Sequence, residues 1–234
     1  RVVATDDKQG PALVAYLKDA GAKSIFVLDD ASQFGKGIAD QVAKDAQAAG
    51  IQVLGHEAAT DKTVDFKAIL TKIKALNPEF IFWGGFGDAA APLIQQSKEL
   101  GLNAKLIAPD GTCTETFIKL AHNSAEGTVC SQAGVPAQKL AKGADFSKLY
   151  ETKYPGQHVE IYAPYAYDAV YAIVNAIKKA NSTDSEAIAA ALPQINFDGY
   201  IGPVAFTPEG ELKNAAVSIL QVKNGAFEVI KIIQ

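Results

Sequence analysis

The chain has 234 residues, of which 48% are hydrophobic and 21% charged, and its formal net charge is −4. This length can bury the core of one large domain or of two small ones, and the composition is typical of a globular protein. The acidic balance and the lack of a basic run argue against a nucleic-acid partner, and no apolar stretch approaches the ~20 residues that span a bilayer.

Residues 1–5 have the composition of a segment from inside a longer polypeptide, and the first residue is Arg1 rather than a methionine. We therefore expect a processed or truncated chain. On this interpretation, the lack of a signal peptide says nothing about the compartment in which the protein works.

One structural unit repeats through the first 134 residues: an amphipathic helix, a Gly or Asn stop, and a short β-branched or aromatic strand. The stops are at Gly21, Gly50, Asn77 and Gly101, and the strands are expected at 24–28, 52–54, 80–83, 105–108 and 127–131. The clearest helix is 66–76, which has one apolar face and has Asp65 in place as its N-cap. Strands that alternate with helices predict an α/β lobe built on a parallel, doubly wound sheet.

After residue 131 the pattern changes. Residues 132–142 are loop-like, and we interpret them as a crossing between two lobes. Helices are expected at 145–154, 162–180 and 185–192, and strands at 204–206, 215–223 and 226–233. In the longest helix, apolar and aromatic residues recur at helical spacing and predict a buried face made of Tyr167, Val170, Tyr171, Val174 and Ile177. Asn224-Gly225 between the last two strands predicts a C-terminal antiparallel hairpin.

Three loops follow expected strands and should meet at the carboxyl edge of the sheet, where open α/β sheets bind ligands. They carry two aromatic residues, Phe34 and Phe86, and one carboxylate, Asp110. Two rings and one anion suit a small ligand that has an ammonium group and an apolar side chain. The ordinary alternatives are that Asp110 is a turn residue in Pro-Asp-Gly and that the rings pack under their loops. Asp29 and Asp30 are expected to hold the loop and the helix start rather than a ligand.

Enzyme motifs are poorly matched, because the chain has neither a Gly-x-Ser-x-Gly elbow nor a P-loop lysine. The exception is residues 85–90, which fit the Gly-x-Gly-x-x-Gly/Ala dinucleotide pattern and have Asp110 about 20 residues further on. Against this alternative, Asp88 would place a negative charge beside the pyrophosphate at the helix N-terminus.

The two cysteines, Cys113 and Cys130, are either buried thiols or a disulfide pair. A zinc site is not expected, because two cysteines and three scattered histidines (His56, His122 and His158) lack ligand spacing. No metal or other cofactor is predicted.

Several segments, in this order and at this spacing, resemble a known family. They are residues 5–11, 29–37, 63–73, 82–86, 108–111, 124–127, 165–170 and 202–206. Together they resemble the periplasmic branched-chain amino-acid binding proteins of ABC transporters, which have the type I periplasmic binding-protein fold. The resemblance extends over nearly the whole chain.

The resemblance implies a periplasmic solute-binding protein rather than an enzyme, with an amino acid and the transporter permease as partners. It implies two lobes, joined by three crossings, that close on the ligand. The acid at Asp110 would hold the ligand ammonium, with Phe34 and Phe86 in contact with the ligand. Relatives often have tyrosine at the two aromatic positions, so phenylalanine removes a hydroxyl. An oxidising periplasm favours a Cys113–Cys130 disulfide.

The resemblance also implies domain boundaries. Residues 1–134 would be the ligand-binding second lobe, 135–213 the returning part of the first lobe, and 214–234 a hairpin that rejoins the second lobe. The family's opening segment is absent, which would expose an apolar face of helix 162–180. We therefore expect a complementary chain, repacking or a dimer. Two alternatives to a solute-binding protein remain: a dinucleotide-binding oxidoreductase domain, and a truncated or engineered half-protein active only in assembly.

Overall fold

The computed structural model describes residues 1–157 and 159–233, so His158 lies outside the described residues. The chain divides into two compact units. The larger unit comprises Thr5–Gln132 and Val217–Ile233, and the smaller unit comprises Arg1–Ala4 and Ala133–Ala216. The sequence predicts that the chain crosses between lobes after residues 134 and 213. In the structure it passes from one unit to the other after Gln132 and Ala216, within three residues of those positions.

The first four residues were expected in the larger unit, but they belong to the smaller one. Hydrogen bonds and an ion pair explain this assignment. The Ala4 amide donates to the Ala133 carbonyl at 3.4 Å, and the terminal ammonium of Arg1 donates to the Gly210 carbonyl at 2.7 Å. The Arg1 guanidinium also pairs with Glu211 at 3.1 Å.

A mostly parallel sheet forms the centre of the larger unit. Its strands are β1 (Ser24–Asp29), β2 (Gln52–Ala58), β3 (Phe80–Gly84), β4 (Lys105–Ala108), β5 (Val129–Gln132), β8 (Val217–Lys223) and β9 (Ala226–Ile233). The order across the sheet is β2-β1-β3-β4-β5-β8-β9, with the first five strands parallel and the last two antiparallel. The predicted α/β fold class and the C-terminal hairpin are confirmed. Residues Asn224 and Gly225 turn that hairpin with φ of 52° and 75°.

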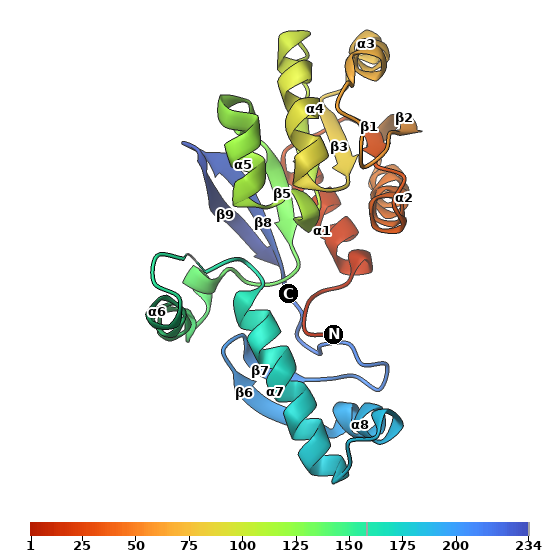
Figure 1. Cartoon of the computed structure of the whole chain (residues 1–234). Coiled ribbons are helices and arrows are strands. Elements are labelled where there is room, and N and C mark those ends of the chain that lie inside the picture. The colour runs from red at the N-terminus through yellow and green to blue at the C-terminus, as the bar shows by residue number, and fades with distance from the viewer. Residues whose placement is uncertain (158, 234) are drawn as a thin grey trace. The chain divides into compact units, whose positions relative to one another are not determined.

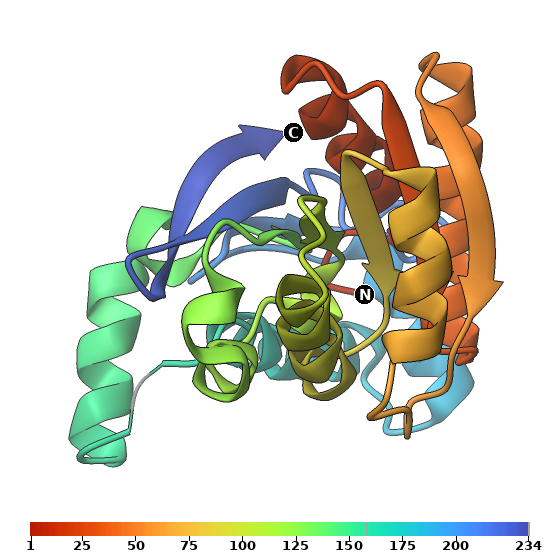
Figure 2. The ribbon, with the colours of Figure 1, turned by 90° about the horizontal axis from the view of Figure 1, so that it is seen from above.

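Helices cover both faces of this sheet, as the two ribbon views show (Figure 1, Figure 2). One face carries α1 (Asp6–Asp19) and α2 (Gln33–Ala48), and the other carries α3 (Lys67–Leu76), α4 (Gly87–Glu99) and α5 (Glu115–Ala121). Two short 3₁₀ turns, η1 (Asp110–Thr112) and η2 (His122–Ala125), flank α5. The four predicted stops all have positive φ, between 49° at Asn77 and 78° at Gly50, a conformation that ends a helix.

One part of the core of the larger unit lies between the sheet and the helices α3, α4 and α5. Apolar side chains of α1 and α2 are fully buried as well. All of β3 is buried, as its apolar sequence predicts, and Trp83 at its end is fully buried. The Trp83 ring meets Phe66 edge-on, with centroids 5.7 Å apart. Asp65 was predicted to cap α3, but the N-cap is Phe66, because the helix starts one residue later. The Asp65 carboxylate still accepts a hydrogen bond from the Lys67 amide at 3.0 Å.

The smaller unit is mostly helical. Its elements are η3 (Ala137–Lys139), α6 (Gly143–Lys153), α7 (Ala163–Ala180), α8 (Ser185–Ala191), η4 (Leu192–Gln194), β6 (Asn196–Gly199) and β7 (Gly202–Ala205). The last two strands form a separate antiparallel pair, of which β6 was not predicted. The predicted buried stripe of α7 is wrong in part, because Val170 and Tyr171 are 58% and 46% exposed. The buried side of α7 is instead made by Tyr165, Asp168, Ala172 and Ala176.

No helix in residues 1–157 or 159–233 combines the length and hydropathy of a membrane span. In the same ranges, no group of three or more His, Cys, Asp or Glu side chains could hold a metal ion.

Candidate functional site

Both predicted aromatic residues begin helices that follow neighbouring parallel strands. Phe34 is the second residue of α2, which follows β1, and Phe86 is the N-cap residue of α4, which follows β3. Because β1 and β3 pair in register up to Asp29 and Gly84, the two loops leave the sheet side by side. The predicted convergence of these two loops follows from this register.

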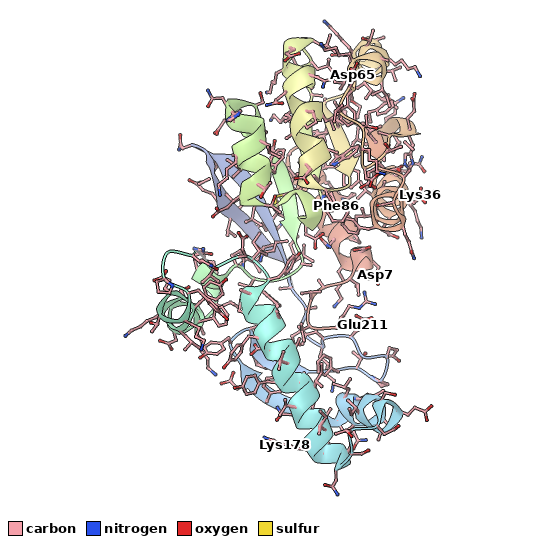
Figure 3. The ribbon with its side chains drawn as sticks, in the orientation of Figure 1. Asp7, Lys36, Asp65, Phe86, Lys178 and Glu211 are labelled. Carbon is pink, nitrogen blue, oxygen red and sulfur yellow. A yellow bond between two sulfur atoms is a disulfide. The ribbon has the colours of Figure 1, made fainter. Side chains whose placement is uncertain are left out.

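The two rings are in contact at this edge of the larger unit. The ring centroids of Phe34 and Phe86 are 5.3 Å apart, with an interplanar angle of 40°. Phe34 is half-buried, whereas Phe86 is 52% exposed at the start of α4 (Figure 3). A large apolar ring exposed this far, next to a second ring, leaves apolar surface that a ligand could cover.

The Asp110 turn packs directly against both rings. Asp110 opens η1 immediately after β4 and Pro109, and it is half-buried. A methyl group placed on the next residue, Gly111, would lie 3.1 Å from Phe34 Cε1 and 3.1 Å from Phe86 Cδ1. A side chain at position 111 would therefore crowd the rings, and glycine lets the turn approach them. The structure thus brings together the three loops that the sequence predicts to meet.

Two hydrogen bonds fix the loops that carry Phe86 and Asp110. The Thr112 hydroxyl, which is buried, donates to the Gly85 carbonyl at 3.1 Å. The indole N–H of Trp83 donates to the Phe86 carbonyl at 3.1 Å. Sequence reasoning did not find the Thr112–Gly85 bond, because it joins two separate loops and leaves no local pattern.

Asp29, the last residue of β1, and Asp30, which follows it, support the loop and the helix start, as expected. Asp29 accepts from the Ala31 amide at 2.8 Å, and its other oxygen lies 2.8 Å from His56 Nε2. Asp30 accepts from the Ser32 amide at 2.9 Å, and the Ser32 side chain caps α2. Both aspartates are buried, so their carboxylates hold the backbone of the loop rather than face an open surface.

A disulfide joins the end of the Asp110 turn to the sheet. Cys113 and Cys130 are bonded, with Cα atoms 5.8 Å apart, and both residues are fully buried. The Cys113 amide also donates to the Asp110 carbonyl at 2.9 Å. The turn that carries Asp110 is therefore covalently tied to β5.

The glycines of the dinucleotide-like motif have packing roles in this structure. A Cβ atom on Gly85 would lie 2.8 Å from Asp30 Oδ2, and one on Gly87 would lie 3.0 Å from Phe117 Cβ. These close approaches account for glycine at both positions without a bound pyrophosphate. Asp88 lies in the first turn of α4, where its charge would oppose an anionic ligand.

The sequence matches a family model described as periplasmic binding protein over residues 1–226. The chain belongs to the periplasmic binding protein family. Its relatives include the leucine-, isoleucine-, valine-, threonine- and alanine-binding protein of Pseudomonas aeruginosa, which is 30% identical over 92% of this chain. Leu/Ile/Val-binding protein homolog 1 of Brucella abortus is 28% identical over 97% of this chain. The chain spans 57% and 61% of the length of these two curated relatives.

Solved structures resemble this periplasmic binding protein over nearly its whole length. The leucine binding protein LivK of Thermotoga maritima has a TM-score of 0.92 and 26% identity, covering 100% of this chain and 67% of that one. The LivJ protein of Streptococcus pneumoniae, solved with isoleucine, has a TM-score of 0.82 and 23% identity, covering 98% and 65%. The predicted resemblance to the branched-chain amino-acid binding proteins and to their fold is confirmed. None of the relatives named here is described as an oxidoreductase.

Proposed function

We propose that this periplasmic binding protein is part of a solute-binding protein of an ABC transporter and binds an apolar, branched-chain amino acid. The observation that carries the proposal is the contact of Phe34, Phe86 and the Asp110 turn at one edge of the larger unit. The names of the relatives support the class of ligand, since they are described as binding leucine, isoleucine and valine.

In this proposal Asp110 binds the ammonium group of the ligand. A carboxylate that accepts a hydrogen bond from an ammonium group forms a charge-assisted bond, which is stronger than a neutral one. The rings of Phe34 and Phe86 would exclude water around that bond and so strengthen it. They would also cover the branched side chain, while either ring face could attract the cation. The site thus fits a zwitterion with an apolar side chain, and binding rather than catalysis is its role.

Three further parts of the proposal rest on the family. We propose a periplasmic location, a transporter permease as the partner, and a ligand held in a cleft that closes between two lobes. In such proteins the ligand stabilises the closed state through contacts made only there. A disulfide in the larger unit agrees with an oxidising compartment.

We also propose that further polypeptide, as a complementary chain or a second copy, covers part of helix α7. Val170 and Ile173 are 58% and 48% exposed one turn apart on this helix, and exposed apolar groups that gather on one face mark an interaction surface. Sedimentation analysis of the isolated chain measures its association. A monomer that unfolds cooperatively and binds leucine tightly on its own would contradict this part of the proposal.

A thermal-shift panel tests the function against its alternatives. We expect leucine, isoleucine and valine to raise the melting temperature of the full chain and to change the fluorescence of Trp83, whose indole bonds to Phe86. A ligand at 100 times its Kd stabilises its target by about 2.7 kcal/mol. A shift with NAD⁺ and none with amino acids would contradict the proposal in favour of a dinucleotide domain. No shift with any compound would contradict ligand binding by this chain alone and favour a half-protein active only in assembly.

A further inference from the structure

The smaller unit contains a pocket of about 360 Å³ that the proposed amino-acid site does not use. Its volume lies within the ~300–1,000 Å³ range of small-molecule sites. Residues from α6, α7 and the β6–β7 pair line it: Lys142, Asp145, Tyr167, Asp168, Tyr171, Phe197, Asp198, Gly199 and Tyr200.

Aromatic rings at different orientations form the walls of this pocket. Tyr167 and Tyr200 are 5.3 Å apart between centroids, with an interplanar angle of 77°. Tyr167 and Tyr171 lie one helical turn apart on α7, with centroids 5.0 Å apart and planes 30° apart. Rings inclined to one another in this way can contact one bound molecule with more than one ring face, and an aromatic face attracts a cation.

Phe146 supports these rings from α6 rather than lining the pocket. It meets Tyr200 at 5.1 Å and Tyr167 at 5.8 Å between centroids, edge-on in both cases. The rings that line the pocket therefore pack against Phe146, and this packing fixes their positions without any ligand. Such preorganisation lowers the entropic cost of binding.

The charge of the pocket is negative. Three carboxylates line it (Asp145, Asp168 and Asp198) against one ammonium, that of Lys142, which already pairs with Asp198 at 2.7 Å. Asp168 is 2% exposed and accepts a hydrogen bond from the Ile201 amide at 2.8 Å, so it is held in place. The Tyr167 hydroxyl donates to the Tyr171 oxygen, and this bond raises the pKa of Tyr167 to about 12.

We propose that this pocket binds an organic cation, such as a quaternary ammonium or a substituted amine, between its tyrosine rings. A net cation fits better than a zwitterion, because the only ammonium among the lining residues is already paired. The site is distinct from the Asp110 edge, which belongs to the larger unit, and the inference does not depend on the proposed function.

Calorimetric titration of the full chain with choline and with 3,3-dimethylbutan-1-ol tests the proposal. The two compounds have the same shape, but only choline carries a charge. We expect choline to bind at least about tenfold more tightly than the alcohol, since cation–π attraction and the carboxylates act on the charge alone. Tyr200→Leu should weaken choline binding by about tenfold, whereas Tyr200→Phe, which keeps the ring, should retain it.

Further variants separate this site from misfolding and from the amino-acid site. Asp145→Asn removes one exposed charge without loss of packing and should weaken choline binding several-fold. Tyr154→Leu, an aromatic change on the same unit outside the pocket, should leave it unchanged, as should Asp110→Asn. Equal binding of choline and the alcohol, no binding of choline, or choline binding that Asp110→Asn abolishes would each overturn the proposal.

Discussion

Leucine binding is expected to weaken by about 1–3 kcal/mol, or roughly 5- to 150-fold in Kd, when Asp110 is replaced by asparagine. Asparagine keeps the size of the side chain and its place at the start of η1, but it loses the charge that would hold the ligand ammonium. The loss is larger than for an exposed ion pair, because Asp110 is half-buried in a turn that packs on Phe34 and Phe86.

Isothermal titration of leucine into the two proteins measures this effect. Glu99→Gln is a suitable control, since it removes the same charge from an exposed residue at the far end of α4. We expect this control to bind leucine like the unmodified chain. An unchanged Kd for Asp110→Asn would rule out the ammonium role of Asp110, whatever the family resemblance implies.

Loss of the Cys113–Cys130 disulfide is expected to lower the free energy of unfolding of the larger unit by about 3 kcal/mol. The two cysteines are 17 residues apart. Closing a loop of about this length lowers the conformational entropy of the unfolded chain, which stabilises the folded state by about 3 kcal/mol. Both residues are fully buried, so Cys113→Ala/Cys130→Ala also leaves a small cavity that adds to the loss.

Urea unfolding followed by Trp83 fluorescence measures this change. Trp83 is the single tryptophan of the chain and is fully buried in the larger unit, so its signal reports that unit. The reduced, unmodified protein is the control, because it loses the bond but keeps both side chains and so separates the cross-link from the cavity. A reduced protein within about 0.5 kcal/mol of the oxidised one would show that the bond adds little to stability.

Local chemistry was enough to predict most of the larger unit. Residues Gly21, Gly50, Asn77 and Gly101 end their helices with positive φ, and the apolar run at β3 is buried throughout. The convergence of Phe34, Phe86 and the Asp110 turn could be predicted as well. It needs only the rule that parallel strands end at one edge, together with the positions of three loops in the sequence.

Contacts between distant segments could not be predicted. The stripe on α7 has the periodicity of a buried face, yet Val170 and Tyr171 are exposed, because the rest of the unit packs on a different side of the helix, the one that carries Tyr165 and Ala172. Periodicity shows that a face is apolar, but it does not show what covers that face. In the same way, the approach of Gly111 to two rings and the Thr112–Gly85 bond depend on tertiary packing and leave no signature in the sequence.

The central claim is that the edge formed by Asp110, Phe34 and Phe86 recognises an ammonium group. The most direct test compares the Kd of L-leucine with that of 4-methylpentanoate, which has the same carbon skeleton and carboxylate but no ammonium, in the unmodified chain and in Asp110→Asn. We expect the unmodified chain to prefer leucine and Asp110→Asn to reduce that preference by at least about fivefold. The same preference in both proteins would contradict the claim.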